Sequence, residues 1–476
     1  MSAVTCFRAS LGIASRLSIC LAMVACGSAD PGPGTRGGTD GGGDGDGGGQ
    51  SPDNMGTVPE PPVQSGVAYL AHWHTAAGGE DKLIWYRTDG EAPYLEGEMD
   101  VGNPTQGMAL DPVNDLLALV SDVGKTITLY KLSRPTSVGE PIVAPVEVGS
   151  FEYGDAGIPV AVFFSPLQHR VYISVSPNGA EMERHDLYAY DTKSSDDVND
   201  ESWLRPIDGW PKAAPIAIRH ETDSARGLLF VSGLRDDKLH VFDLSDDGLT
   251  PLDGGAIDLA AEFPVPEGMT TQAAFQARQV RVDPWRNRVY VVRSQGAFSE
   301  MMAYSYPADV PRFGAKYGDF AGTADFQKIS DPFDLTVPLE ERPNLLEGYD
   351  TDIDVNTGAV FMSADAWNGT ASTALIAGFS SDLQSLAVGC DEHEGFGCFV
   401  RYVSDNVASG YQRTDGSMCT DSTHNVVVAT SVATDETEPG LAHFYKYDQS
   451  LGMTRWNPET GRSLVASSLP VGAVCH

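Results

Sequence analysis

The stretch VRVDPWRNRVYVV, residues 280–292, places two short apolar runs on either side of an Asp-Pro turn. Apolar runs of this length, rich in β-branched and aromatic residues and bounded by Pro and Asn, are typical of a β-hairpin. Related stretches occur along the chain at 107–120, 160–174, 216–232, 349–363 and 417–431. The sequence therefore contains six visible copies of one hairpin.

The first strand of each copy ends in a polar turn, typically at Asp111, Ser165, Asp283, Asp354 or Asp421. The side-chain oxygens of Asp and Ser accept hydrogen bonds from backbone N–H groups about two residues further on, which closes a turn. We therefore predict a structural role, rather than a catalytic one, for the residues at this position.

A loop and a third strand follow each hairpin. These third strands are expected at 126–132, 185–192, 238–244, 301–307, 372–379 and 441–448. A fourth, less regular strand then leads to the next copy. The turn residues recur every 54 to 71 positions, which is the spacing of four-stranded propeller blades rather than of a solenoid with shorter coils.

The two ends of the repeat region complement each other. Residues 66–90 supply a second strand, a loop and a third strand, but no first strand. Residues 471–475, after the sixth copy, form a lone short apolar strand. We predict that this strand is the innermost strand of the N-terminal blade, so that 66–476 is an all-β, seven-bladed β-propeller closed by its C-terminal strand.

The repeat resembles that of the YVTN/lactonase-like seven-bladed β-propeller superfamily. The matching second strands are RVYIS (170–174), LLFVS (228–232), RVYVV (288–292) and AVFMS (359–363). The resemblance implies a propeller over most of residues 66–476. It implies no activity, since this superfamily contains binding proteins and enzymes alike, and no lactonase motif can be placed on named residues of this chain.

The N-terminus is predicted to direct export. Residues 1–25 carry Arg8 and Arg16 before an apolar run that is too short to span a bilayer. The segment LAMVACGS, around Cys26, resembles a bacterial lipobox, so residues 1–25 are interpreted as a lipoprotein signal peptide and Cys26 as the lipidated residue. The alternative is an ordinary cleaved signal in which Cys26 is incidental. Gly27 is not the Asp that favours inner-membrane retention in some bacteria, which favours the outer membrane.

The segment that follows is predicted to be a disordered tether. Residues 26–65 are rich in Gly, Asp and Pro and contain little that could be buried. A flexible chain of this length has a root-mean-square reach of roughly 35 Å. The folded head is therefore expected to stand off the membrane of a bacterial cell envelope.

The composition excludes some partners. The formal net charge is −35, and such a surface repels nucleic acids. Cations, basic partners or simple solubility are the compatible interpretations. No cofactor is predicted; weak calcium binding by the acidic tether is an open possibility, although no recognised ligand spacing requires it.

Four cysteines remain after the leader and Cys26: Cys390, Cys398, Cys419 and Cys475. In an exported protein an even number of cysteines suggests disulfides, and four allow three pairings. We favour Cys390 with Cys398 as a local loop closure, and Cys419 with Cys475 as a bond between the last and first blades. The alternative for CDEHEGFGC (390–398) is a metal site with His393; we predict none.

Candidate ligand-binding residues are those expected in loops at one mouth of the axial channel, or lining it. They are His72, His74, Arg184, His185, Arg235, Arg293, Asp350, Asp352 and Asp365. A His-x-His pair on an extended strand projects both imidazoles to one side and could serve a metal, but no third ligand stands at a recognisable spacing. The alternative is a structural pair packed beside Trp73.

No catalytic residues can be assigned from the sequence. It contains no G-x-S-x-G elbow, P-loop or dinucleotide-binding glycine motif. The expected function is therefore an envelope-tethered lipoprotein whose propeller is a non-catalytic binding or scaffolding module. The alternative is an exported lactonase-like or quinoprotein-like propeller enzyme acting at the axial funnel. Its protein or small-molecule partner, and its oligomeric state, are not indicated.

Overall fold

The computed structural model divides the chain into two units, Met1–Met55 and Gly56–His476, and all residues it describes belong to the second. The described residues are 58, 60–74, 81–101, 105–121, 124–153, 158–176, 186–192, 205–206, 220–232, 238–245, 248–262, 276–295, 298–307, 327–328, 333–334, 337–339, 342–367, 372–383, 391–393, 396–401, 411–413, 417–433, 441–448, 453–456 and 468–476.

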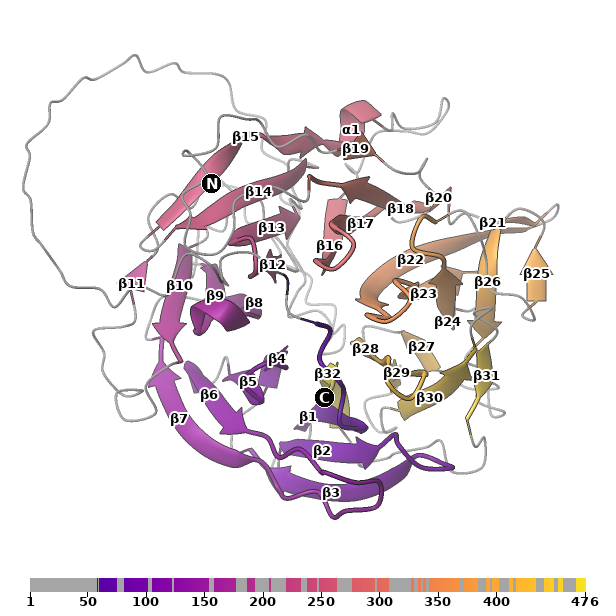
Figure 1. Ribbon diagram of the computed structural model, residues 1–476. Helices are drawn as coiled ribbons and strands as arrows, with labels where there is room; N and C mark the ends of the chain where they lie inside the picture. The colour runs from indigo at the N-terminus through magenta and orange to yellow at the C-terminus, as the bar shows by residue number, and fades with distance from the viewer. Residues whose placement is uncertain are drawn as a thin grey trace, which may run out of the picture. The chain divides into compact units, whose positions relative to one another are not determined.

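The described strands form seven antiparallel sheets, numbered here in chain order (Figure 1). Sheet 1 has the strand order β3 (Tyr94–Asp100), β2 (Lys82–Arg87), β1 (Val67–His74), β32 (Ser468–Cys475). Sheet 2 contains β4 (Thr105–Asp111), β5 (Leu116–Ser121), β6 (Thr126–Lys131) and β7 (Val146–Glu152). Sheet 3 contains β8 (Ile158–Ser165), β9 (Arg170–Ser176), β10 (Asp186–Asp191) and β11 (Arg205–Pro206), with the 3-10 turn η4 (Pro166–Gln168) after β8.

Sheet 4 contains β12 (His220–Asp223), β13 (Leu228–Ser232), β14 (Lys238–Ser245) and β15 (Gly248–Asp258), followed by the short helix α1 (Leu259–Glu262). Sheet 5 contains β16 (Gln276–Asp283), β17 (Arg288–Gln295), β18 (Phe298–Ser305), β19 (Gln327–Lys328) and β20 (Phe333–Asp334). Sheet 6 has the order β21 (Val337–Leu339), β22 (Arg342–Ile353), β23 (Val360–Trp367), β24 (Ser372–Phe379), β26 (Phe396–Arg401), β25 (Asp391–His393). Sheet 7 contains β27 (Tyr411–Arg413), β28 (Met418–Asp421), β29 (Val426–Ala433), β30 (Leu441–Tyr447) and β31 (Met453–Arg455).

Three sheets depart from the expected count of four strands. In sheet 5 the outer position is shared by two short pieces, β19 and β20, which both pair with β18. In sheet 7 the inner position is divided in the same way between β27 and β28, which both pair with β29. Sheet 6 instead gains a hairpin partner at each edge, β21 and β25. Interrupted strands and added hairpins change the strand number without changing the order of the four central positions.

The C-terminal strand pairs with the N-terminal sheet. β32 runs antiparallel to β1, with Tyr69 opposite Val474, and a bulge interrupts the register between Ala71 and His72. The pairing continues past the strand, because the His476 N–H donates to the Val67 carbonyl at 2.8 Å and the Val67 N–H donates to the His476 oxygen at 3.3 Å. The predicted neighbour of the lone C-terminal strand is therefore the observed one.

Sheets 1, 2, 3, 4 and 7 bury apolar side chains against both of their neighbours. In β5 every residue is buried: Leu117 and Leu119 pack toward sheet 1, while Ala118 and Val120 pack toward sheet 3. Apolar clusters of this kind join sheets 1 and 2, 2 and 3, 3 and 4, 4 and 5, 6 and 7, and 7 and 1. The innermost strands contact one another in the order β32, β4, β8, β12, β16, β22, β28 and again β32.

The turn after each innermost strand has one shared conformation. The fourth residue after the Asp or Ser adopts the left-handed backbone region, with φ between 50 and 78°, at Asp115, His169, Gly227, Asn287, Gly358 and Asn425. Asn, Asp and Gly adopt this region most readily. The same turn geometry explains why the phrase at 280–292 recurs.

The buried Asp of each turn serves as its cap. The Asp111 Oδ1 accepts hydrogen bonds from the N–H groups of Val113 at 3.0 Å and Asn114 at 2.9 Å, and Asp111 has no exposed surface. Asp354 accepts the N–H of Asn356 at 2.8 Å in the same manner. The predicted structural role is confirmed for Asp111, Asp283, Asp354 and Asp421, each of which accepts a backbone N–H of its own turn. The Ser165 side chain, in contrast, makes no such bond in the turn of sheet 3.

Side chains of the turns also join each sheet to the next. Such bonds run from Asn114 to the Pro166 carbonyl (3.1 Å), Gln168 to Leu244 (2.9 Å), Arg226 to Pro284 (3.0 Å), Arg286 to Asn356 (2.7 Å) and Asn356 to Ser422 (2.9 Å). They all point forward along the series of sheets. The turn is therefore both a hairpin closure and a contact between sheets.

Gly66 tests how far this turn geometry controls stability. It adopts φ 76°, and a Cβ at this position would lie 2.6 Å from the Cβ of Asp89. Gly227 adopts φ 66° in the equivalent place of sheet 4, but its nearest neighbour would be 3.9 Å away. We expect Gly227→Ala to cost about 1 kcal/mol of unfolding free energy, the usual left-handed penalty, and Gly66→Ala to cost clearly more because a clash is added. Denaturant unfolding of both variants measures this; equal losses would show that the close approach at Gly66 is unimportant.

Candidate functional site

The structure places the predicted ligand-binding residues in three groups. His72, Asp350 and Asp352 are described with their side chains. Three residues lie on strands and have only their backbone position described: His74 on β1, Arg293 on β17 and Asp365 on β23. Three further residues lie outside the described residues, namely Arg184, His185 and Arg235. Of the whole set, the described structure brings together Asp350 and Asp352, both on β22.

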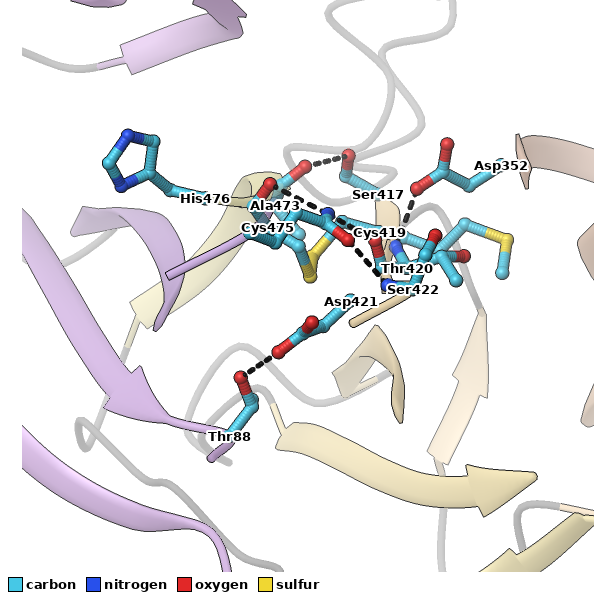
Figure 2. The surroundings of a disulfide bond; sticks show 12 residues. Thr88, Asp352, Ser417, Cys419, Thr420, Asp421, Ser422, Ala473, Cys475 and His476 are labelled. Carbon is cyan, nitrogen blue, oxygen red and sulfur yellow. Dashed lines mark hydrogen bonds between the residues drawn. A yellow bond between two sulfur atoms is a disulfide. The ribbon is translucent and has the colours of Figure 1, made fainter. Parts of the chain in front are cut away.

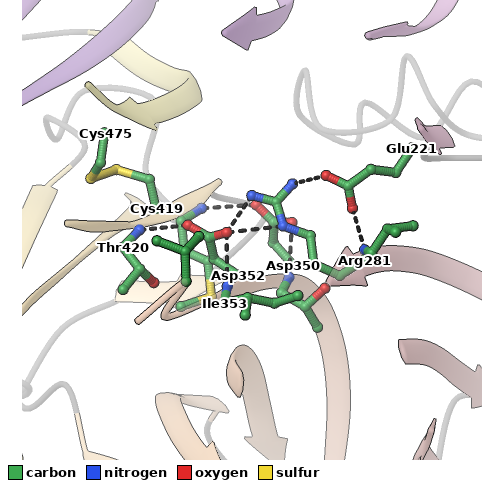
Figure 3. Close-up of polar contacts among 12 residues, drawn as sticks. Glu221, Arg281, Asp350, Asp352, Ile353, Cys419, Thr420 and Cys475 are labelled. Carbon is green, nitrogen blue, oxygen red and sulfur yellow. Dashed lines mark hydrogen bonds and ion pairs between the residues drawn. A yellow bond between two sulfur atoms is a disulfide. The ribbon is translucent and has the colours of Figure 1, made fainter. Parts of the chain in front are cut away.

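A cluster of charged side chains lies between the innermost strands of sheets 4, 5 and 6. Figure 3 shows the Arg281 guanidinium from β16 between two carboxylates. Its Nη1 donates to Glu221 on β12 at 2.7 Å, and its Nε donates to Asp352 on β22 at 2.9 Å. We call Glu221, Arg281 and Asp352 the axial triad. It links three innermost strands through one cation.

The carboxylates of the axial triad also bind main-chain groups. The second oxygen of Glu221 accepts the N–H of Val282 at 2.7 Å, and Asp352 accepts the N–H of Ile353 at 2.8 Å and that of Thr420. Innermost strands have an edge without a sheet partner on the inner side, so their N–H groups need other acceptors. The carboxylates of neighbouring sheets supply them.

Asp350 acts in the same way between sheets 6 and 7. Its Oδ2 accepts the N–H of Met418 at 2.8 Å and the hydroxyl of Ser417 at 3.2 Å, while Oδ1 accepts the N–H of Thr351 at 2.9 Å. Asp350 is only 4% exposed. Both oxygens are thus engaged in protein hydrogen bonds, which favours a structural use of this carboxylate; ligand binding by Asp350 and Asp352 stays a prediction.

The electrostatics of the axial triad favour its charged form. Burial opposes the charge on Arg281, but the carboxylates of Asp352 and Glu221 outweigh that cost and raise the pKa of the guanidinium above its usual value. The side chains of Arg281 and Glu221 remain about one-fifth exposed, at 21% and 23%. The triad is consequently a partly solvated ion network, which stabilises only when all its members are present.

His72 lies apart from the axial triad, in sheet 1. It sits on β1 opposite Lys82, at the bulge where β1 and β32 shift register. The residue is 2% exposed, and burial lowers the pKa of its imidazole to about 4, against a smaller opposing effect of Glu98. His72 is therefore neutral at pH 7. Its buried position agrees with the structural alternative for the His-x-His pair, while the side chain of His74 is not described.

A second polar cluster lies where β32 meets sheet 7. Cys419 on β28 and Cys475 on β32 form a disulfide, with Cα atoms 5.4 Å apart (Figure 2). This is the bond that the sequence analysis predicts between the last and first sheets. The other predicted pair is not described, because Cys390 lies outside the described residues and only the backbone of Cys398, on β26, is placed.

Gln64 fastens the segment before β1 to the same place. Its Nε2 donates to the carbonyls of Thr420 at 2.7 Å and Cys475 at 3.2 Å, and its Oε1 accepts the N–H of Ser422. One amide side chain therefore bridges both innermost strands that the disulfide joins. Gln64 lies in the segment 26–65 that is predicted to be a disordered tether, and its bonds to these strands are a departure from that prediction.

The register of the repeat could have revealed the axial triad. Glu221, Arg281 and Asp352 each stand two residues before the turn Asp of their own copy, at Asp223, Asp283 and Asp354. Alternation in a strand places such residues on one face. Charged residues at the same position of three consecutive copies indicate an ion network between their strands.

Sequence comparisons identify no relatives: no family model matches the chain, and no curated protein matches its sequence. Solved structures match its fold. A hypothetical selenium-binding protein from Sulfolobus tokodaii is 11% identical, with 86% of this chain and 93% of that chain covered and a TM-score of 0.52. A protein from Lactobacillus plantarum is 13% identical, with 86% and 98% covered and a TM-score of 0.50.

A structure described as a putative 6-phosphogluconolactonase from Bacteroides uniformis also matches, at 12% identity with a TM-score of 0.48, covering 86% of this chain and 99% of that one. At such identities the similarity concerns the fold alone. The first two structures therefore show a shared fold, and the resemblance to the lactonase-like superfamily stays a prediction.

Two further properties concern only the described residues. Among them, no group of three or more His, Cys, Asp and Glu side chains is placed to hold a metal ion. Within the same residues, no helix is both long and apolar enough to cross a membrane.

The axial triad predicts a large effect of removing its cation. Arg281→Met leaves two carboxylates facing each other, and we expect a loss of roughly 2–4 kcal/mol in unfolding free energy at neutral pH. Lys82→Met is the matched control, because Lys82 pairs with Glu98 at 2.5 Å where that carboxylate is 45% exposed, and exposed pairs contribute below about 1 kcal/mol. Denaturant titration compares the two; a loss no greater in Arg281→Met would contradict the importance of the triad.

Proposed function

We propose that this protein is an envelope-tethered lipoprotein whose closed, seven-bladed propeller is a binding or scaffolding module without catalytic turnover. Closure is supported by the pairing of β32 with β1 and by the unbroken succession of contacts between innermost strands. The observation that carries the non-catalytic assignment is the engagement of the axial carboxylates. Glu221, Asp350 and Asp352 all accept main-chain N–H groups of neighbouring strands.

The chemistry of catalysis explains this choice. A general acid or base needs a proton-exchanging group within reach of a substrate, usually beside other groups that converge on one point. In the axial triad the ionisable groups face one another and the strand edges. These groups are suited to holding neighbouring sheets in register. We therefore propose that a partner binds to the loops at one end of the series of sheets.

The disulfide supports an extracytoplasmic location. Cys419 and Cys475 are 3% and 6% exposed, and structural disulfides persist mainly in oxidising compartments such as the bacterial periplasm or cell surface. Together with the lipobox around Cys26 this favours the cell envelope, with the outer membrane preferred because of Gly27.

Anchoring is tested by Cys26→Ser in a bacterial host. Since the thiol is the site of acylation, we expect the wild type in the outer-membrane fraction and the variant in the soluble or inner-membrane fraction, measured by fractionation and by incorporation of labelled fatty acid. Cys20→Ser, within the leader, is the control and should behave as the wild type. Fatty-acid labelling that persists in Cys26→Ser would contradict the proposal.

Turnover is tested with a panel of sugar lactones and other small ligands. A binding module should show ligands that raise the melting temperature, because a ligand that binds only the native state stabilises it, while those ligands are recovered unchanged. Lactone hydrolysis above the uncatalysed rate, with saturation kinetics, would instead establish the enzyme alternative.

A further inference from the structure

Large apolar side chains are exposed on sheets 1 and 2 and on the segment before β1. They are Val63, Tyr94, Leu95, Val138, Val143 and Val146, and each is between 47% and 74% exposed. We call these six residues the apolar patch. A single exposed apolar side chain needs no explanation, whereas a contiguous group marks a surface that contacts a partner or a membrane.

The strand register places the apolar patch at the end of the sheets where the hairpin turns lie. Tyr94 begins β3 opposite Arg87, and Arg87 lies opposite Val67, the first residue of β1. In sheet 2, Val146 begins β7 opposite Lys131, the last residue of β6. Both outer strands therefore start at the turn end, and residues 132–145, which join β6 to β7, belong to the same end.

The loop 132–145 of sheet 2 is bonded to sheet 1. Arg87 donates to the carbonyl of Glu140, and the N–H of Ile142 donates to the carboxylate of Glu96 at 3.2 Å. Ile142 precedes Val143, and Glu96 follows Leu95. The contacts thus join chain neighbours of patch residues from the two sheets, which makes the patch continuous across them.

Arg134 joins the same loop to the segment before β1. Its Nη1 donates to the carbonyl of Val63 at 2.9 Å, and its Nη2 donates to the carbonyl of Pro112, beside Val113, which is itself 49% exposed. The side chains of Arg134 and Lys131 are 35% and 50% exposed. Two cations therefore border the apolar patch.

The predicted lipid tether leads to this end of the sheets. Residues 26–65 connect Cys26 to β1, and within them Val63 belongs to the patch while Gln64 is bonded to the Thr420 carbonyl at 2.7 Å. A flexible tether of this length reaches roughly 35 Å and holds the folded head at an effective concentration in about the millimolar range. An interface that is weak on its own is then well populated.

The charge of the chain decides which lipid surface fits. Its formal net charge is −35, and Glu91, Glu96 and Glu147 stand close to patch residues in the sequence. These charges disfavour an anionic surface, which attracts polybasic segments. A zwitterionic phospholipid surface carries no net charge, so apolar side chains are buried at its acyl boundary without that repulsion.

We propose that the apolar patch docks on the zwitterionic phospholipid surface that holds the lipid anchor. The choice of a membrane as the occupant rests on the proposed function, which it deepens. Apolar side chains enter the boundary between headgroups and acyl chains, while the bordering Lys131 and Arg134 extend their charged ends to the headgroups. The loops proposed to bind a partner follow strand ends such as His74 of β1, at the opposite end, and docking turns them away from the membrane.

Quenching of tryptophan fluorescence by brominated phospholipids tests the contact. Tyr94→Trp and Asp100→Trp place the probe at the two exposed ends of β3, about 20 Å apart at roughly 3.3 Å per residue. With the acylated full chain in zwitterionic vesicles, and after subtraction of the wild-type signal, we expect bromine in the acyl chains to quench Tyr94→Trp and to leave Asp100→Trp unchanged. An unquenched Tyr94→Trp overturns the membrane as the occupant and points to a protein partner instead.

A charge-matched pair of variants tests the apolar side chains themselves. Val138→Asp combined with Val143→Asp lowers the net charge by as much as Lys125→Asp does. Lys125 lies between β5 and β6 at the opposite end of sheet 2, with φ 52°, which Asp tolerates. In the non-acylated Cys26→Ser chain, we expect the double variant to lower partitioning into zwitterionic vesicles about tenfold or more, and Lys125→Asp to leave it unchanged. Co-sedimentation measures both; equal losses would refute docking by the patch.

The two proposals fail in different ways. Labelling of Cys26 by fatty acid, together with equal partitioning of the double variant and Lys125→Asp, refutes docking and leaves the anchor intact. Absence of labelling, together with a loss confined to the double variant, refutes the anchor and leaves the lipid contact of the patch. Both variants change exposed positions, so unchanged melting temperatures are expected and show that the fold is retained.

Discussion

The protein depends on one constraint: most of its described sheets are apolar on both faces and bury these faces between two neighbouring sheets. β5 shows this directly, because alternate residues of one buried strand pack into two different cores. Burial of apolar area is the main favourable term in folding, but it has no direction. Directional polar contacts must therefore fix how neighbouring sheets are placed against each other. The polar contacts described above lie on the innermost strands and in the turns that follow these strands.

The polar contacts form two levels along the series of sheets. At the turns, a buried Asp closes its own hairpin while a neighbouring side chain, such as Asn114 or Arg286, reaches the next sheet. On the innermost strands, before the turns, the carboxylates of Glu221, Asp350 and Asp352 accept N–H groups that have no partner within their own sheets. An all-apolar centre could not satisfy those groups. This explains why charged residues occur on the innermost strands β12, β16 and β22.

Much of this architecture could be predicted from the sequence, because hairpins with a repeated turn leave a local pattern. The strands around 107–120 and 280–292, the structural role of Asp111, and the Cys419–Cys475 bond all follow from that pattern and from the pairing of the chain ends. The uses of Gln64, Arg281 and His476 do not follow from local pattern, since each depends on a residue of another sheet. The short strands β19, β20 and β21 do not follow from the sequence either. A two-residue piece such as β19 is ordered by its pairing with β18 and has no periodicity of its own.

The contact between Asp115 and His476, 3.0 Å between Oδ1 and Nε2, also bears on how far the repeats are interchangeable. Position 115 needs only a residue that tolerates a left-handed backbone, and other turns use Asn, Gly or His there. Asp at this place is explained by a residue of sheet 1 rather than by its own hairpin. A version of the protein in which all copies are replaced by one consensus unit would keep every hairpin but lose the carboxylate that contacts His476. A residue that differs between the copies can therefore be explained by its contact with a neighbouring sheet rather than by its own hairpin.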